Sequence, residues 1–107
     1  MPKPPTPAPD DATRPLSERV LSCVEQIPPG KVLAYSDVAE FVGTKAARNV
    51  GRIMAAEGGS VPWHRVVRAD GSLAPHIRAE QLARLRAEGV AIRGERVDMS
   101  RARWDGR

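Results

Sequence analysis

Cys23 is the only cysteine of this 107-residue chain and therefore its only thiol. A reactive thiol is usually kept deprotonated by a neighbouring cation or histidine, and no histidine or acid stands at a spacing that marks Cys23 as activated. Because Cys23 falls inside a predicted helix, we expect it to fill the core. A single cysteine also excludes an internal disulfide and a cysteine-rich zinc site. We therefore expect no structural metal, no cofactor and a reducing, cytoplasmic setting.

Trp63 stands in a second segment of chemical interest, Val61 to Val67, which has the sequence Val-Pro-Trp-His-Arg-Val-Val. An indole is not a nucleophile that a protein can use, because its N–H only donates hydrogen bonds and it has no accessible anionic form. We therefore expect Trp63 to contact a bound group without reacting with it.

The clearest candidate for binding is the basic face of a predicted helix over residues 45–56. Its basic side chains recur at i, i+3 and i+7 with no acid among them: Lys45, Arg48 and Arg52. Its small residues would let the helix backbone approach a nucleic-acid groove closely: Ala46, Ala47 and Gly51. An ordinary amphipathic helix with a solvated basic face is the alternative interpretation.

Charge is divided unevenly along the chain. Residues 1–43 hold four Lys/Arg and six Asp/Glu, a balance of −2, whereas residues 44–107 hold thirteen and seven, a balance of +6. With a pI near 10.0, this asymmetry is typical of a surface that neutralises phosphates and releases their counterions. Charge alone fits a merely solvated basic surface about as well. No apolar run approaches the roughly 20 residues that span a bilayer, so we do not expect a membrane protein.

These candidate residues must be positioned by one small domain, which we place at residues 16–107. Ahead of it, residues 1–15 hold six of the ten prolines and are predicted to form a disordered, partly polyproline tail. Apolar residues at helical spacing predict a first helix over residues 16–27, which Pro28 and the residues after it end.

Two further helices are predicted next. Ser36 is expected to cap a helix over residues 36–43, which Gly43 can close, and Thr44 is expected to cap the basic helix over residues 45–56. Two helices joined by a turn that contains glycine are typical of a helix-turn-helix.

The remainder is predicted to add a wing and one more helix. Residues 66–68 and 72–74 flank an Ala-Asp-Gly segment that is typical of a tight hairpin turn. A helix is expected from about His76 to Glu88, and Trp104 is expected to pack back onto the domain. The predicted fold class is mainly α, a winged helix-turn-helix domain with a small β-hairpin.

Four segments occur in the order in which a known protein family carries them: Pro29 to Val32 with Tyr35, Lys45 to Gly51, Pro62 to Val67 with Gly71, and Glu88 with Gly89. Over roughly residues 16–93 the chain resembles the DNA-binding domain of the O6-alkylguanine-DNA alkyltransferases. Their Pro-Cys-His-Arg-Val motif appears here with tryptophan in place of the nucleophilic cysteine. The closest resemblance is to the alkyltransferase-like proteins, which bind alkylated DNA without dealkylating it.

The resemblance implies roles for two residues in nucleotide flipping. Arg48 matches the arginine finger, which enters the duplex from the minor groove and fills the gap left by the extruded nucleotide. Tyr35 matches the tyrosine that helps to rotate the target nucleotide and contacts the flipped guanine. A phosphate contact for Arg48 and a half-buried core position for Tyr35 are the alternatives.

The resemblance also implies a lesion pocket, with Tyr35 at its edge and Trp63 as an apolar wall. In the enzymes, the residues at the positions of His64 and Glu88 activate the cysteine. Without that thiol, we interpret them as a structural hydrogen-bonded pair that shapes the pocket floor together with Arg65, with residual chemistry as the alternative. Val66 is placed in the same pocket.

The lid of this pocket departs from the family pattern. The Tyr-Ser pair that covers the base in the active enzymes is missing, as is the asparagine that precedes their active-site motif. His76 or Arg78 is left as the candidate contact to the alkylated base.

Three functions fit these observations. The leading hypothesis is a monomeric, non-enzymatic sensor that flips O6-alkylguanine in double-stranded DNA and flags it for nucleotide-excision repair, a partner implied by the resemblance alone. The second is a suicide alkyltransferase that uses Cys23 or another acceptor. The third is a winged-helix regulator that reads DNA sequence or shape through Lys45, Arg48 and Arg52.

Overall fold

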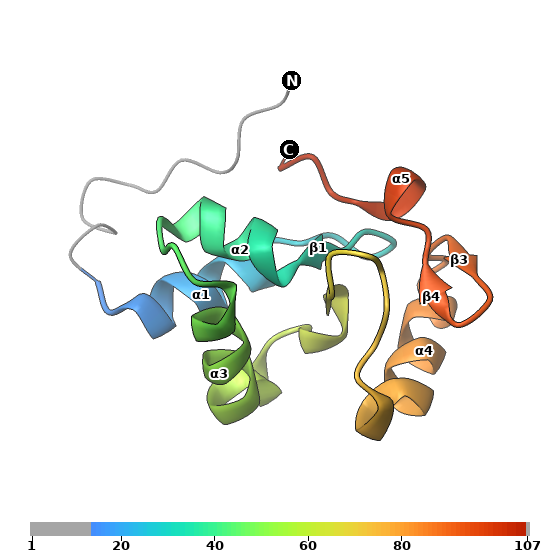
Figure 1. The fold of residues 1–107 in the computed structure, drawn as a ribbon, viewed down its shortest axis with the longest axis horizontal. Coiled ribbons are helices and arrows are strands. Elements are labelled where there is room, and N and C mark those ends of the chain that lie inside the picture. The colour runs from blue at the N-terminus through green and yellow to red at the C-terminus, as the bar shows by residue number, and fades with distance from the viewer. Residues whose placement is uncertain (1–13, 107) are drawn as a thin grey trace.

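A computed structural model describes residues 14–106, so the predicted proline-rich tail lies almost entirely outside the described residues. Within them, none of the helices is long and apolar enough to cross a membrane. Figure 1 shows the helices α1 to α3 on one side of the molecule and α4, the β3–β4 pair and α5 on the other. A short parallel strand pair, β1 with β2, lies between the two sides.

Three helices form the first side. They are α1 (Leu16–Glu25), α2 (Tyr35–Val42) and α3 (Ala47–Glu57). The face of α1 that the sequence predicted to be apolar is buried, and Cys23 lies on that face with 5% of its surface exposed. Val50 of α3 is fully buried in the same hydrophobic cluster. The predicted helix-turn-helix is confirmed as α2 and α3, and Gly43 closes α2 with a φ of 82°.

Both predicted capping residues were wrong. The capping carboxylate of α2 belongs to Asp37, whose Oδ2 accepts a hydrogen bond from the Ala34 N–H at 2.9 Å, whereas Ser36 is exposed. The α3 helix begins at Ala47 after an extended Ala46, because Thr44 is engaged elsewhere: its N–H bonds to α2 and its Oγ1 accepts from the Asn49 amide. Lys45 and Ala46 therefore precede the helix on which they were placed.

The strand pair joins the two sides of the molecule. β1 (Leu33–Ala34) and β2 (Val66–Val67) run parallel, with Leu33 opposite Val66. Because successive side chains of a strand point to opposite faces, Leu33 and Val66 join the cluster under the three helices. Val32 and Val67 join a second cluster, which also holds Leu85 of the helix α4.

The second side is built on α4 (Arg78–Ala87), which follows a single 3₁₀ turn at Pro75–Ile77. This confirms the helix predicted from about His76 to Glu88. Two short antiparallel strands follow, β3 (Ile92–Arg93) and β4 (Arg96–Val97).

The predicted hairpin was misplaced. A tight turn does form where it was expected, with Gly71 donating to the Arg68 carbonyl at 2.8 Å, but residues 72–74 form no strand. The turn instead bonds to β4, because the Val97 N–H donates to the Gly71 carbonyl at 2.9 Å. The predicted fold class is confirmed, with its hairpin at β3 and β4.

The chain then returns to the first side. After α5 (Met99–Ala102), Trp104 packs edge-on against Phe41 of α2, with ring centroids 6.4 Å apart. Trp104 is 8% exposed and belongs to the cluster under the three helices. The prediction that Trp104 packs back onto the domain is confirmed.

Candidate nucleic-acid interface

The basic face of the helix-turn-helix carries three exposed cations. Arg48 and Arg52 are exposed on α3, and Lys45 is exposed just before it. Within residues 14–106, none of the three makes a hydrogen bond or an ion pair. The small residues of this face are half-buried: Ala46, Ala47 and Gly51. Unpaired guanidinium and ammonium groups on a helix are available to phosphates or bases.

A cavity of about 200 Å³ lies where the start of α2, the strand β2 and the helix α4 meet. The segment after the Gly71 turn closes it on a further side. Its walls combine apolar and polar side chains: Tyr35, Val66, Val67, Arg68, Ser72, Leu73, Ala74 and Gln81. Concave sites that combine apolar walls with a few polar groups are typical of small-molecule binding.

Tyr35 borders this cavity from the first position of α2. Burial raises the pKa of its phenol, and the positive charge of Arg68 opposes that shift. The phenol therefore stays protonated at neutral pH and can both donate and accept a hydrogen bond.

Gln81 is a functional candidate that the sequence did not reveal. Its buried amide Nε2 donates to the carbonyls of His64 at 3.1 Å and Val66 at 3.0 Å, so α4 fixes the backbone of the cavity wall. A signal for it was available, since a polar residue at position 81 interrupts the apolar spacing of Ile77 and Leu85 on one helix face. Arg68 was missed as well, and its exposed position after a strand gave no such signal.

Glu88 connects two residues of the Trp63 segment. Its Oε2 lies 2.9 Å from His64 Nε2 and accepts from Arg65 Nη2 at 2.6 Å, while Oε1 accepts from Arg65 Nε at 3.0 Å. Arg65 also donates to the Ile27 carbonyl at 2.8 Å. The hydrogen bonds from Arg65, and then those from His64, lower the pKa of Glu88 to about 2. The arrangement ties α1, α4 and the Trp63 segment together.

His64 is 9% exposed at its side chain, and its Nδ1 has no hydrogen-bond partner in the described part of the chain. In a neutral imidazole, which has one N–H, the bond to Glu88 would place that proton on Nε2 and leave the buried Nδ1 as an acceptor. The residue beside it, Trp63, offers no thiol or hydroxyl that Nδ1 could deprotonate.

Trp63 lies against α4. Its ring meets the His64 ring edge-on at 6.1 Å, and the guanidinium carbon of Arg84 lies 5.4 Å from the indole centroid. Such a cation over an indole face is mildly attractive. Arg84, which no sequence pattern singled out, therefore holds the half-buried indole from the solvent side.

The structure brings together only some of the predicted pocket residues. Tyr35 and Val66 line the cavity of about 200 Å³. Of the other described candidates, His64, Arg65 and Glu88 form a hydrogen-bonded cluster and do not line the cavity, and neither does Trp63, which contacts His64 edge-on.

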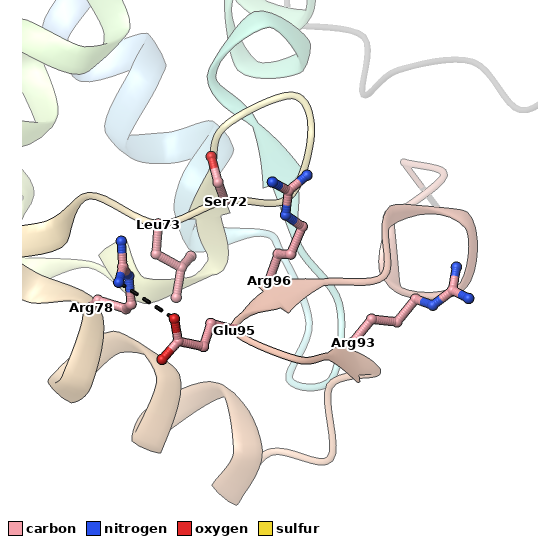
Figure 2. Close-up of a pocket in the computed structure, with 6 residues that line it drawn as sticks. All are labelled: Ser72, Leu73, Arg78, Arg93, Glu95 and Arg96. Atoms are coloured by element: carbon pink, nitrogen blue, oxygen red, sulfur yellow. Dashed lines mark hydrogen bonds and ion pairs between the residues drawn. The ribbon is translucent and has the colours of Figure 1, made fainter.

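A second cavity, of about 340 Å³, lies behind the segment that closes the first one and shares Ser72 and Leu73 with it. Figure 2 shows its arginine side chains and the ion pair between Arg78 and Glu95, at 3.5 Å. Arg96 pairs with Asp70 at 3.7 Å. Arg78 and Arg96 therefore already face carboxylates, whereas Arg93, the third arginine of the lining, forms no ion pair within residues 14–106. Of the two lid candidates, Arg78 lines this second cavity and the exposed His76 lines neither.

Comparison with known proteins gives consistent matches. Residues 15–90 match the family model described as the 6-O-methylguanine DNA methyltransferase DNA-binding domain. A protein of Escherichia coli named DNA base-flipping protein is 40% identical over 95 residues, which are 82% of this chain and 73% of that protein. Alkyltransferase-like protein 1 of Schizosaccharomyces pombe is 40% identical over 81 residues, covering 69% of this chain and 75% of the relative.

Solved structures agree in fold. The crystal structure of S. pombe Atl1 in complex with damaged DNA containing O6-carboxymethylguanine superposes with a TM-score of 0.74 and 30% sequence identity. The match covers 83% of this chain and 94% of that one. A second complex, of S. pombe ATL with DNA, gives a TM-score of 0.73 at 32% identity over 82% and 93% of the two chains.

Proposed function

Because the chain belongs to the family of the 6-O-methylguanine DNA methyltransferase DNA-binding domain, we propose that it is a non-enzymatic sensor of DNA damage. It binds duplex DNA that contains O6-alkylguanine, rotates the damaged nucleotide out of the helix and leaves the alkyl group in place. The relatives named for base flipping, and the solved complex with O6-carboxymethylguanine, support this proposal.

The observation that carries the non-enzymatic part is the position of the only thiol. Cys23 is buried in the helical core, and burial raises the pKa of its thiol to about 12. Alkyl transfer needs a thiolate within reach of the substrate carbon. Cys23 does not line the cavity beside Tyr35, and Trp63 occupies the position at which the related enzymes carry their nucleophile.

Flipping is assigned to Arg48 and Tyr35. An unpartnered guanidinium can enter the minor groove, stack on the neighbouring bases and replace the extruded nucleotide. Arg52 and Lys45 then contact phosphates, with the small residues Ala46, Ala47 and Gly51 allowing close approach. Extrusion costs a few kcal/mol of stacking and pairing, and less for a damaged pair. This difference gives the first part of the lesion selectivity.

The flipped base is assigned to the cavity beside Tyr35. Val66 and Leu73 supply apolar contact, and the phenol and Gln81 supply polar groups for the base edge. Both hydrogen bonds of the Gln81 amide nitrogen are already used, which leaves its carbonyl oxygen as an acceptor. The cluster of His64, Arg65 and Glu88 keeps the floor rigid. His76 and Arg78 are both kept as proposed contacts to the alkyl group, although neither lines this cavity and Arg78 lines the second one.

We also propose that the protein is monomeric and cytoplasmic, and that it is associated with the nucleoid while it is bound to DNA. Nucleotide-excision repair is proposed as the system that receives the complex. Because the protein leaves the alkyl group in place, another repair system must remove the lesion.

Equilibrium titration of two duplexes, identical except for one O6-methylguanine, tests the proposal at matched salt. We expect tighter binding to the methylated duplex, and weak, strongly salt-dependent binding to the unmodified one. Equal affinities would contradict the proposal. Strong preference for particular unmodified sequences would favour a sequence-reading regulator instead.

A further inference from the structure

The last residue of α5 and the two residues after it form a strap that fastens the strand leading into α2 to the rest of the domain. We define this C-terminal strap as Ala102–Trp104. Val32 donates to the Ala102 carbonyl at 2.9 Å, and Trp104 donates to the Val32 carbonyl at 2.8 Å. Val32 directly precedes β1, so the strap lies alongside the strand that leads into α2. It lies beyond residues 15–90, which match the family model.

Arg103 extends from this strap to a buried carboxylate. Its Nε donates to Asp37 Oδ2 at 3.0 Å, and its Nη2 donates to Asp37 Oδ1, which makes a two-pronged pair. The side chain of Asp37 is 5% exposed. A carboxylate removed so far from water needs a charged partner, and two parallel N–H···O bonds also fix its orientation.

The same carboxylate organises the first turn of α2. Asp37 Oδ2 accepts the Ala34 N–H at 2.9 Å, and a negative charge in a first turn is favoured by the helix dipole. Tyr35 is the residue between this N–H and this carboxylate, at the first helical position. The direction in which its phenol leaves the backbone therefore depends on the turn that Asp37 holds.

We propose that Arg103 is a positioning residue for Tyr35: through Asp37 it fixes the first turn of α2 and holds the phenol at the edge of the cavity. The functional effect of this positioning rests on the proposed function. If the cavity receives a flipped base, a phenol that is already in place binds it more tightly than one that must first be ordered. Trp104, the last residue of the strap, contacts Phe41 near the other end of α2.

Tyr35 is the only tyrosine of the chain, so its position can be followed directly. A protein labelled with ¹³C at the tyrosine Cζ gives a single resonance, whose titration reports the pKa of Tyr35. In Arg103→Gln we expect this pKa to fall toward its ordinary value, because the phenol loses part of its burial. Arg101→Gln is the matched control, since it removes the same charge from an exposed position two residues away, and it should leave the titration unchanged.

The effect on function is measured as the ratio of affinities for the methylated and unmodified duplexes. We expect Arg103→Gln to lower this ratio by about tenfold while Arg101→Gln preserves it. In a Tyr35→Phe background, Arg103→Gln should cause no further loss. An equal loss in both backgrounds, or an unchanged Tyr35 titration in folded Arg103→Gln, would overturn the proposal.

Two further variants keep the test decisive. If Arg103→Gln does not fold, Arg103→Lys, which keeps the charge without the planar fork, is measured in the same two ways and judged by the same outcomes. Asp37→Asn keeps an acceptor for the Ala34 N–H but loses the ion pair, so it should behave like Arg103→Gln. If the wild-type protein shows no lesion preference, the proposed function fails, and the Tyr35 titration still decides the positioning claim.

Discussion

Nε2 of His64 and Nη2 of Arg65 reach the same oxygen of Glu88, at 2.9 Å and 2.6 Å. A catalytic relay would need a thiol beside His64, and the neighbouring residue is Trp63. We therefore interpret the pair of His64 and Glu88 as a structural element: with Arg65 it joins Glu88, which directly follows α4, to the segment that carries Trp63 and to Ile27, which follows α1.

Glu88→Gln should destabilise the fold. The pKa of Glu88 is lowered to about 2 in the folded protein, so the carboxylate stabilises the fold at and above its unfolded pKa. That stability is lost as the pH falls from about 4.5 toward about 2. We expect Glu88→Gln to lower the free energy of unfolding near pH 7 by roughly 2 kcal/mol and to flatten this acid dependence.

Urea unfolding between pH 7 and pH 2 measures this dependence. Glu80→Gln is the control, because Glu80 forms an exposed i,i+4 pair with Arg84 and should change stability by about 0.5 kcal/mol or less. If the two variants had the same pH profile, the Glu88 cluster would not be a stabilising element.

Arg48→Ala should remove lesion discrimination more than it removes general affinity. A finger that replaces the flipped nucleotide acts only on damaged, opened DNA, whereas a phosphate contact acts on every duplex. We expect the affinity ratio to fall about tenfold or more in Arg48→Ala. Arg52→Ala removes an equally exposed arginine of the same helix and should weaken both duplexes alike. Fluorescence anisotropy with both duplexes, over a series of salt concentrations, separates these effects.

Cys23 should be chemically silent in the folded protein. Because burial raises its pKa to about 12, almost no thiolate exists at pH 8, and a thiol reagent should label it only after denaturation. Intact-protein mass spectrometry after incubation with methylated DNA should show no added methyl group. A stoichiometric gain of one methyl mass would restore the suicide alkyltransferase, and peptide mapping would identify the acceptor.

Gly71→Ala should destabilise the turn that closes the cavity. A Cβ at this position would lie 2.1 Å from the Val97 carbonyl oxygen, and Gly71 has a φ of +84°. Gly89→Ala is the matched control, because its φ is +77° with no atom within 4 Å. We expect Gly89→Ala to cost about 1 kcal/mol from backbone strain, and Gly71→Ala to cost at least about 1 kcal/mol more. Equal melting temperatures for the two variants would mean that the turn does not rest on β4.

Local patterns predicted the helices well, because apolar spacing is a short-range signal. The helices containing Val20, Val50 and Leu85 lie within a few residues of their predicted bounds. The cap of α2 was wrong because its capping acid, Asp37, is stabilised by Arg103, a contact 66 residues away. The hairpin was misplaced for a similar reason, since the Gly71 turn bonds to Val97.

Only those residues of the candidate site that belong to a recognisable sequence motif could be predicted. His64 of the Trp63 segment and its partner Glu88 are 24 residues apart in the sequence. Their pairing was predicted only from the family resemblance. Gln81 left one local signal, its polar side chain on an apolar helix face, whereas Arg68 and Arg84 left none. The cavity itself depends on the parallel pairing of β1 with β2, which no short pattern indicates.

The central claim is that this protein selects O6-alkylguanine and leaves it unchanged. The most direct measurement incubates excess DNA, an equal mixture of methylated and unmodified duplex, with the protein, isolates the complex and quantifies O6-methylguanine in the bound and total DNA by mass spectrometry. We predict that bound DNA is enriched in the lesion and that the total amount of lesion is unchanged. Bound DNA with the same lesion content as the input, or a loss of lesion equal to the protein added, would contradict the account.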